Sequence, residues 1–448
     1  MADAGRGRFA RTSLGVFAAQ LLVTALGVGT SVITARALGP HDRGLFQLLI
    51  LLPTTLSNFV KFGIPQANVY FIRRRGAAAS DVASNALWIA LALGTGLGVV
   101  CYLGRTWLLT TILRGVPERT LGPALFMIPF VLLQTYFFGV LQAEERFGEY
   151  NLQQLAPTVL ALLGMAIALL WLHMGLLGAI VTQAGVLVVV SLWLALRVHR
   201  TAPLRRAWNA PLARGMLGFG GKSYVQTLAA TLHLRIDQYM IAMLLDPTQV
   251  GLYAVAVNLT NLLLKIPDAT GTVLYPRLAE AGERAAHATT SRVCRHTLFL
   301  TATVSLAYVV GGPFAIRFLY GVQFAGAIRP MLVMLPGIVM ISLYMILTRN
   351  FTSRNRQGVN IVAAVAALGI NVGLNVLLIP RWGIVGAAVS TSVSYSVAAL
   401  ILLVMFVRES GHTVRETVLV GRAEVGEYAR LAARVRAPAP AAAKSRAS

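Results

Sequence analysis

Charged and polar side chains recur at helical spacing inside several strongly apolar segments of this sequence. Between residues 217 and 244, four of them fall within an arc of about 60° when successive residues are placed 100° apart: Lys222, Gln226, His233 and Asp237. Arg235 points roughly the opposite way. Polar groups on one face of an apolar helix need water, a ligand or a partner there, so this face is a candidate functional surface.

Three other apolar segments carry a polar face of the same kind. In 250–275 the face spans about 80° and holds Asn258, Asn261, Lys265, Asp268 and Thr272. In 45–72 it holds Gln47, Thr54, Asn58, Lys61 and Asn68. In 358–379 it holds Asn360, Asn371 and Asn375. Four such faces on separate helices predict a hydrated chamber between helix bundles.

The charges on these faces need an explanation, because a charge at the centre of a bilayer costs at least about 2.5 kcal/mol. We expect them to face the hydrated chamber. The alternative is a set of structural pairs, in which Lys61 or Arg235 is neutralised by Asp268 or Asp237.

Ligand binding and ion transfer are the chemistry that these residues offer. His233 and Asp237 are four residues apart, so they either relay protons or share a local hydrogen bond. The seven histidines do not cluster, and the glycine-rich stretch that ends at Lys222 lacks the spacing of a phosphate-binding loop. We therefore expect no metal site, no cofactor and no enzymatic activity.

The elements that carry these faces are membrane spans. Hydrophobic residues make up 56% of the 448 and charged residues 12%, with a mean hydropathy of +0.70, whereas a soluble domain carries about 25% charge. Apolar runs of roughly 20 residues, the length that crosses a hydrocarbon core, recur along the chain. They predict an all-α polytopic membrane protein with about twelve transmembrane helices: 14–36, 45–72, 82–104, 121–142, 153–172, 175–197, 217–244, 250–275, 295–319, 329–348, 358–379 and 383–407.

The uneven distribution of Lys and Arg among the loops, in a chain of net charge +23, predicts the orientation of these spans. Most Lys and Arg residues lie in one set of loops and in the two termini, which the positive-inside rule places in the cytoplasm. Lys61 and Lys265 then lie about 22 Å into spans that descend from the outside, in the cytoplasmic third of the bilayer. Cations at that depth favour an anionic headgroup and repel an organic cation. No soluble basic domain is present to hold a duplex, so nucleic acid is not an expected partner.

The chain contains an internal repeat. Gly39-Pro40-x-x-x-Gly44-Leu45-Phe46 recurs as Asp246-Pro247-x-x-x-Gly251-Leu252-Tyr253, and Gly175-x-x-Gly178-Ala179 recurs as Gly383-x-x-Gly386-Ala387. Both offsets are about 207 residues, or six predicted spans. The repeat therefore predicts two six-helix lobes that are related by an axis along the membrane normal, with a substrate between them.

Spans, charge and repeat together predict five regions. These are a cytoplasmic N-terminus (1–13), an N-lobe (14–198), a basic cytoplasmic linker (199–216), a C-lobe (217–407) and a basic cytoplasmic tail (408–448). Within the tail, about 414–435 is either an amphipathic helix on anionic lipid or disordered.

The repeated motifs resemble those of a known transporter family. Ala37-Leu38-Gly39-Pro40-x-x-x-Gly44-Leu45-Phe46 is similar to the opening of bacterial polysaccharide-export flippases. So is Arg235-Ile236-Asp237-Gln238-Tyr239-Met240-Ile241 followed by Val250-Gly251-Leu252-Tyr253-Ala254-Val255-Ala256, then Pro267 and Tyr275-Pro276-Arg277-Leu278. The resemblance, from about residue 12 to 407, is to the Wzx-type members of the multidrug/oligosaccharidyl-lipid/polysaccharide (MOP) exporter superfamily.

This resemblance implies a MATE-like fold and a flippase of the bacterial cytoplasmic membrane. Its substrate would be a polyprenyl-diphosphate-linked oligosaccharide, moved to the outer leaflet by alternating access for cell-surface polysaccharide biosynthesis. Membrane lipids, H⁺ or Na⁺ as coupling ion and polysaccharide synthases are the implied partners.

On this hypothesis each polar residue has a role. The diphosphate is attracted by Lys61, Lys265, Lys222 and Arg235. The sugar is hydrogen-bonded by Asn58, Asn258, Asn261, Asn371 and Asn375. The coupling ion is carried by Asp237, Asp268 and His233, unless these two carboxylates pair with the cations.

Two alternatives share the fold. An ion-coupled multidrug exporter would have a more acidic and aromatic cavity, and lipid II flippases usually have about fourteen spans. A membrane enzyme would need a longer loop than any in this chain.

Overall fold

The computed structural model describes residues 2–144, 147–206, 208–222, 228 and 231–421, and the described part is helical without strands. The first half contains α1 (Ala2–Val60), α2 (Ile64–Arg73), α3 (Ala79–Leu103), α4 (Arg105–Thr111), α5 (Glu118–Ala143), α6 (Phe147–Met165), η1 (Ala166–Trp171), α7 (Gly175–Thr201) and α8 (Ala210–Lys222). The second half contains α10 (Ile236–Leu244), α11 (Pro247–Leu263), α12 (Lys265–Glu280), α13 (Glu283–Ala315), η2 (Ile316–Tyr320), η3 (Val322–Ala327), α14 (Ile328–Ser353), α15 (Gln357–Ser410) and α16 (Val414–Val418).

The predicted all-α polytopic architecture is confirmed. Among the described residues, nine helices are long and apolar enough to cross a membrane. The helix α15 contains two predicted spans, and α1 contains one together with the first part of the next, 45–72, which continues in α2. The predicted span 217–244 is divided between α8 and α10, and part of the segment that joins them lies outside the described residues.

Glycines mark the turns inside the two longest helices. Gly39 in α1 has φ +71° and Gly383 in α15 has φ +59°, a region that glycine enters without strain. Contacts between the segments before and after each glycine show that the chain reverses direction there. Arg43 lies 3.5 Å from Ser31 across the first turn.

The second span of each repeat is interrupted at a corresponding place. α1 ends at Val60 and α2 begins at Ile64, while α11 ends at Leu263 and α12 begins at Lys265. Between α1 and α2, Phe62 and Gly63 adopt positive φ values of 42° and 64°. Interrupted helices leave backbone groups and charged side chains near the middle of a transporter, where substrate and ions bind.

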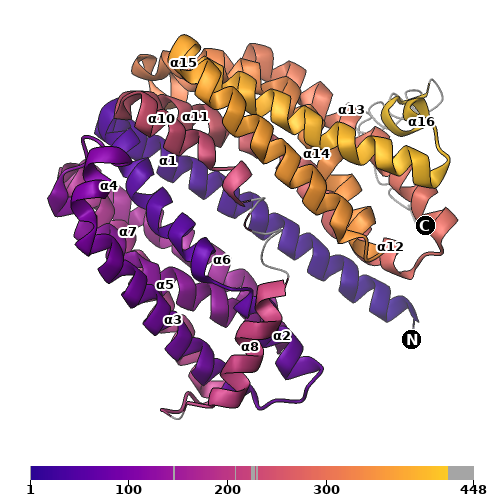
Figure 1. The fold of residues 1–448 in the computed structure, drawn as a ribbon, viewed down its shortest axis with the longest axis horizontal. Coiled ribbons are helices and arrows are strands. Elements are labelled where there is room, and N and C mark those ends of the chain that lie inside the picture. Colours follow the sequence, from indigo (N-terminus) through magenta and orange to yellow (C-terminus); the bar gives the residue numbers. More distant parts are fainter. Residues whose placement is uncertain (1, 145–146, 207, 223–227, 229–230, 422–448) are drawn as a thin grey trace, which may run out of the picture.

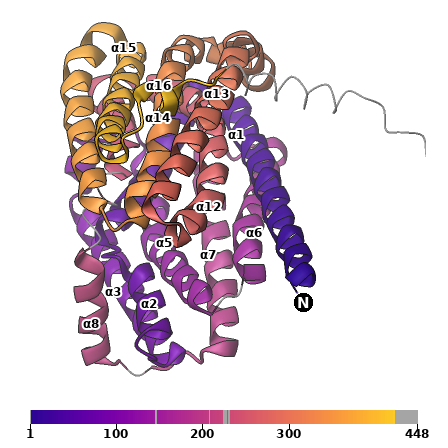
Figure 2. The same cartoon turned by 90° about the vertical axis from the view of Figure 1, so that its right-hand side faces the viewer.

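The helices pack as two lobes. In Figure 1 the lobes converge at one end, where α10 and α11 lie against α1, and they stand apart at the other, where α8 and α12 are separated. Figure 2 again separates α12–α15 from α2, α3 and α8. The helix α8 begins within the predicted linker and ends in the predicted C-lobe, yet it packs on α2, with Phe219 stacked on Tyr70 at 4.2 Å between ring centroids. The first part of the predicted seventh span therefore lies against the N-lobe.

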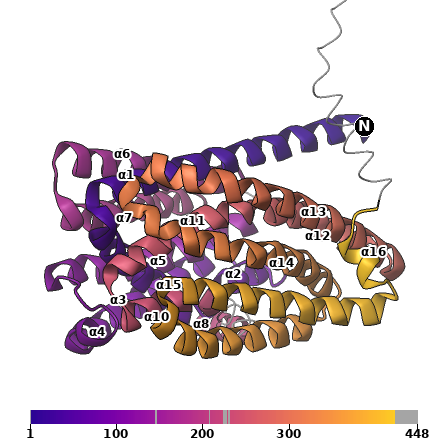
Figure 3. The same cartoon turned by 90° about the horizontal axis from the view of Figure 1, so that it is seen from above.

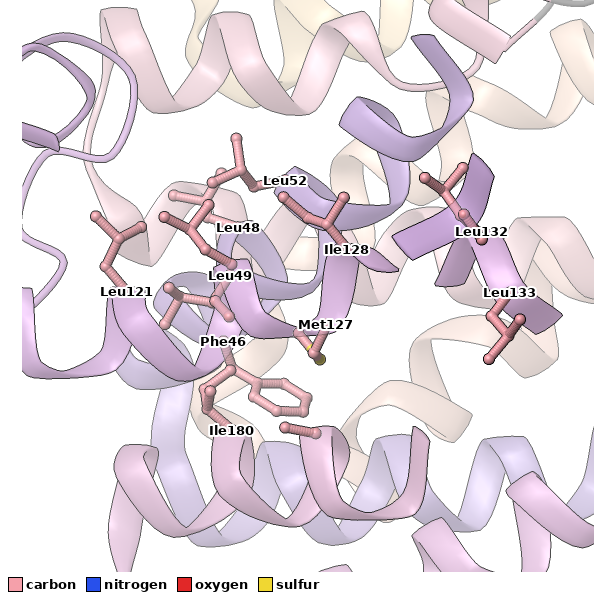
Figure 4. Packing of buried hydrophobic residues seen from close by; sticks show 14 of the residues in the cluster. Phe46, Leu48, Leu49, Leu52, Leu121, Met127, Ile128, Leu132, Leu133 and Ile180 are labelled. Carbon is pink, nitrogen blue, oxygen red and sulfur yellow. The ribbon is translucent and has the colours of Figure 1, made fainter. Parts of the chain in front are cut away.

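The largest apolar core is centred on the N-lobe and continues across the lobe contact into α10, α11, α14 and α15. In the N-lobe, leucines of the second half of α1 pack against α5, and Phe46 and Ile180 extend the cluster to α7 (Figure 4). In the C-lobe, buried residues of α12, α13, α14 and α15 form a second cluster. The lobes therefore share apolar packing where they meet, while the C-lobe has a further core of its own.

The lobes meet through the repeated Gly-Pro and Asp-Pro motifs. A Cβ atom at Gly44 would lie 1.7 Å from the carbonyl oxygen of Pro247, and one at Gly251 would lie 2.1 Å from that of Pro40. Only glycine fits at both positions. We call this the outer end, because the charge bias places these turns outside. Exposed tryptophans at the same end, Trp107, Trp171 and Trp382, are typical of a membrane interface.

The N-terminus and α16 lie at the opposite end of the molecule (Figure 3). α16 begins with a capping box, in which the Thr413 side chain accepts from Glu416 N and the Glu416 side chain accepts from Thr413 N. Ser291 of α13 donates to the Glu416 carbonyl oxygen at 3.0 Å. The rest of the predicted tail helix 414–435, from residue 422 onward, lies outside the described residues.

Candidate functional site

A cavity of about 470 Å³ lies between the lobes. Its walls come from α1, α6 and α7 on one side and from α11, α12 and η2 on the other. Two cations line it, Arg43 and Lys265, and none of its described lining residues is acidic. The other polar lining residues carry hydroxyl or amide groups, among them Thr24, Ser31, Gln47, Thr158, Gln183 and Asn258, and apolar side chains supply most of the remaining surface.

A second cavity, of about 280 Å³, lies within the C-lobe and shares Lys265 with the first. Its lining brings together five of the residues singled out in the sequence: Arg235, Asp237, Asn261, Lys265 and Asp268. Asp237, from the polar face predicted for 217–244, thus meets the face predicted for 250–275, and Arg235, which was predicted to point the opposite way, lines the same cavity.

The other predicted cations lie elsewhere. Lys61, in the break between α1 and α2, is half-buried and donates to Asn58 Oδ1 at 2.8 Å, and neither residue lines these two cavities. Lys222 ends α8, and its side chain is outside the described part. Asp268 lies 3.6 Å from Arg349. Among the described residues, neither Lys61 nor Arg235 forms the carboxylate pair that the sequence left open.

The Asp237 carboxylate is buried in the C-lobe among polar neighbours. Asn375 Nδ2 donates to Oδ1 at 2.6 Å, and the hydroxyls of Thr391 and Tyr253 donate to Oδ2 at 2.5 and 3.0 Å. Asn375 also donates to Asn371 Oδ1 at 3.1 Å. Among the described residues, no Lys or Arg nitrogen lies within 4 Å of this carboxylate. A buried carboxylate held only by neutral donors needs a proton or a small cation for charge balance.

His233 is connected to this network indirectly, through Ser394. Its Nε2 lies 3.5 Å from Ser394 Oγ, which accepts from Asn371 Nδ2 at 3.4 Å, and its ring stacks on Tyr395. Its partners are therefore on α15, and the link to Asp237 runs through asparagine amides. His233 Nδ1 has no hydrogen-bond partner in the described structure.

Sequence reasoning missed several of these residues. Thr391, Ser394 and Tyr395 belong to a polar stretch, Ser390-Thr391-Ser392-Val393-Ser394-Tyr395-Ser396, which is visible within an apolar span and was the available signal. Arg43 lies between two predicted spans, 14–36 and 45–72, whereas the structure buries it in the lobe interface.

Two helical lobes around a cavity with polar and cationic lining residues are the arrangement of a membrane transporter. Residues 10–282 match the family described as "Polysaccharide biosynthesis protein", and the chain belongs to this family. This match confirms the predicted resemblance to polysaccharide-export proteins, and solved structures of the MOP superfamily share the fold.

Two of these structures are transporters captured in inward states. The lipid II flippase MurJ, in an inward closed conformation, aligns with a TM-score of 0.75 at 14% identity over 89% of this chain and 90% of that one. An inward-facing multidrug resistance MATE family transporter of the MOP superfamily aligns with a TM-score of 0.69 at 16% identity over 87% and 94%. Both show the MATE-like fold.

A curated relative is the probable low-salt glycan biosynthesis flippase Agl15 of Haloferax volcanii. It is 24% identical over 193 residues, which cover 41% of this chain and 40% of that protein. The match thus spans less than half of either chain. The family match and the shared fold therefore place this chain among the polysaccharide biosynthesis proteins, with a MATE-like membrane fold.

Proposed function

We propose that this protein flips a polyprenyl-diphosphate-linked oligosaccharide from the cytoplasmic to the outer leaflet of a bacterial cytoplasmic membrane, for cell-surface polysaccharide biosynthesis. The observation that carries the proposal is the chemistry of the cavity between the lobes. Its charged lining residues, Arg43 and Lys265, are cations, and its polar remainder is hydroxyl and amide. Cations suit phosphate oxygens and neutral polar groups suit sugar hydroxyls.

The predicted binding residues divide by position. Lys265 and Arg235 receive the diphosphate where the two cavities meet, and Asn258 and Asn261 contact the sugar. Lys61, oriented by Asn58, and Lys222 add positive charge on the cytoplasmic side. A synthase that extends the oligosaccharide on the outer leaflet is the expected partner.

The Asp237 network is the coupling site in this proposal, with H⁺ or Na⁺ as the ion. Asn371 and Asn375 are fully buried and contact Asp237 or its hydrogen-bonded neighbours, so we assign them to the ion rather than to the sugar. His233 extends the same network. Asp268 already has Arg349 as its partner, which leaves Asp237 as the carboxylate available to an ion.

A liposome assay tests the substrate. The purified chain is reconstituted, and a fluorescent polyprenyl-diphosphate oligosaccharide is followed by quenching from one side. We expect fast flipping by the wild type, a loss of at least tenfold in Lys265→Ala and substantial activity in Lys265→Arg, which keeps the charge. Arg408→Ala, an exposed change outside both cavities, serves as the control.

The same assay separates the alternatives. Transport of a cationic dye without flipping of the lipid would identify a multidrug exporter and contradict the proposal. Faster flipping of lipid II than of lipid-linked oligosaccharides would reassign the substrate to peptidoglycan synthesis.

A further inference from the structure

Arg43 is a buried cation without a counter-charge. Its side chain is 4% exposed, Nη2 lies 3.5 Å from Ser31 Oγ, and Nε has no hydrogen-bond partner in the described structure. The guanidinium lies 5.5 Å from the centre of the Phe46 ring. No described carboxylate lies within 4 Å of it. Such a group is costly to bury unless an anion joins it.

The surroundings of Arg43 come from both lobes. Tyr320 of η2 donates to Ser31 Oγ at 3.3 Å, and all three side chains line the cavity between the lobes. In the repeat, the position equivalent to Arg43 is Val250, which is fully buried. The lobe contact therefore tolerates an apolar residue at this position, and the charge is a feature of one lobe alone.

Arg43 and Lys265 occupy opposite ends of the cavity. Arg43 is adjacent to Gly44, which packs against the start of α11 near Gly251. Lys265 follows Gly251 by about 14 residues, a distance of about 21 Å along a helix. A headgroup that binds at Lys265 must still cross this distance to reach the outer end.

We propose that Arg43 is a second anion site, which binds the diphosphate of the lipid-linked sugar at the outer end of the cavity. This inference rests on the proposed function. A guanidinium with free N–H groups binds phosphate oxygens in bidentate fashion, and the headgroup supplies the missing counter-charge. When the lobes separate at the outer end, water reaches Arg43, weakens the ion pair and releases the headgroup.

Arg43→Gln and Arg43→Lys test the inference in the full-length protein. Binding of the fluorescent polyprenyl-diphosphate sugar to detergent-solubilised protein is measured beside flipping in liposomes. We expect Arg43→Gln to keep the dissociation constant within about threefold, because Lys265 remains, and to slow flipping at least tenfold. Arg43→Lys should retain intermediate activity. Arg114→Gln, an exposed arginine at the same end, should match the wild type.

The outcomes are distinguishable. Wild-type flipping by Arg43→Gln, with Lys265→Ala inactive, would overturn the second site and leave the proposed function intact. Failure of the wild type to bind or flip the probe would overturn the proposed function itself. If Arg43→Gln instead reduces thiol cross-linking between His41→Cys and Thr248→Cys at the lobe contact, then Arg43 serves lobe closure and the anion site is rejected.

Discussion

At the scale of single residues, Asp237 is positioned to couple ion binding to a change of conformation. Its neighbour Gln238 accepts from Gln47 Nε2 at 2.9 Å, a hydrogen bond between the two lobes. Its carboxylate is bound by Thr391 and Tyr253, which come from α15 and α11. An ion that enters or leaves this network therefore acts on helices that contact the other lobe.

Asp237→Asn should uncouple transport from the ion gradient. The amide has the size of the carboxylate but neither takes up a proton near neutral pH nor attracts a cation. We expect an imposed H⁺ or Na⁺ gradient to accelerate wild-type flipping several-fold and to leave Asp237→Asn unaffected. Asp268→Asn, which removes a half-exposed partner of Arg349, should keep the response. An Asp237→Asn protein that still responds would place the coupling site elsewhere.

The sequence located polar faces better than it assigned their roles. Helical periodicity placed Asp237 and His233 on one face, and Asn371 and Asn375 on another, because spacing alone determines a face. It could not show that Asn375 contacts Asp237, since that contact depends on how α10 and α15 pack. Arg43 was missed for the same reason, because burial at a lobe interface leaves no mark in local spacing.

At the scale of elements, the helix crossing at Gly44 and Gly251 holds the outer end together. We expect Gly44→Ala to prevent full closure, because the new Cβ would overlap the Pro247 carbonyl and backbone cannot yield as a flexible side chain does. Cross-linking between His41→Cys and Thr248→Cys should fall at least threefold, and flipping with it. Gly96→Ala is the control, since a Cβ there meets nothing within 4 Å. Unchanged cross-linking in Gly44→Ala would show that the crossing adjusts.

The same elements show where sequence-based prediction of the fold succeeds and stops. The turns at Gly39 and Gly383 were recognisable as gaps between apolar runs, so the spans on either side were placed correctly. The packing of α8 on α2 could not be recognised from the sequence, because the Phe219–Tyr70 stack joins segments that are far apart in the chain. Local hydrophobicity predicts that a span exists, whereas its lobe is decided by contacts with other helices.

At the scale of the whole molecule, the two repeats meet on their own symmetry axis. His41 Nδ1 and Thr248 Oγ1 lie 3.5 Å apart and are separated by 207 residues, the offset of the repeat, so equivalent positions of the two halves face each other. Arg36 adds a second contact between the lobes by donating to the carbonyl oxygens of Leu319 and Phe318 at 2.7 and 2.5 Å. These contacts close the outer end, while α8 and α12 stand apart at the other (Figure 1).

A cross-link on this axis should trap one state of the transport cycle. His41→Cys and Thr248→Cys are introduced into a chain whose native Cys101 and Cys294 are replaced by alanine, and a short thiol-reactive linker joins them. Because alternating access requires the outer end to open, we expect flipping to stop after cross-linking and to return when a cleavable linker is cut. Arg105→Cys with Glu118→Cys, which replaces a 2.8 Å ion pair within the N-lobe, is the matched control and should leave flipping unchanged. Undiminished flipping by the cross-linked His41–Thr248 pair would mean that the lobes need not separate here, and that the substrate leaves by another route.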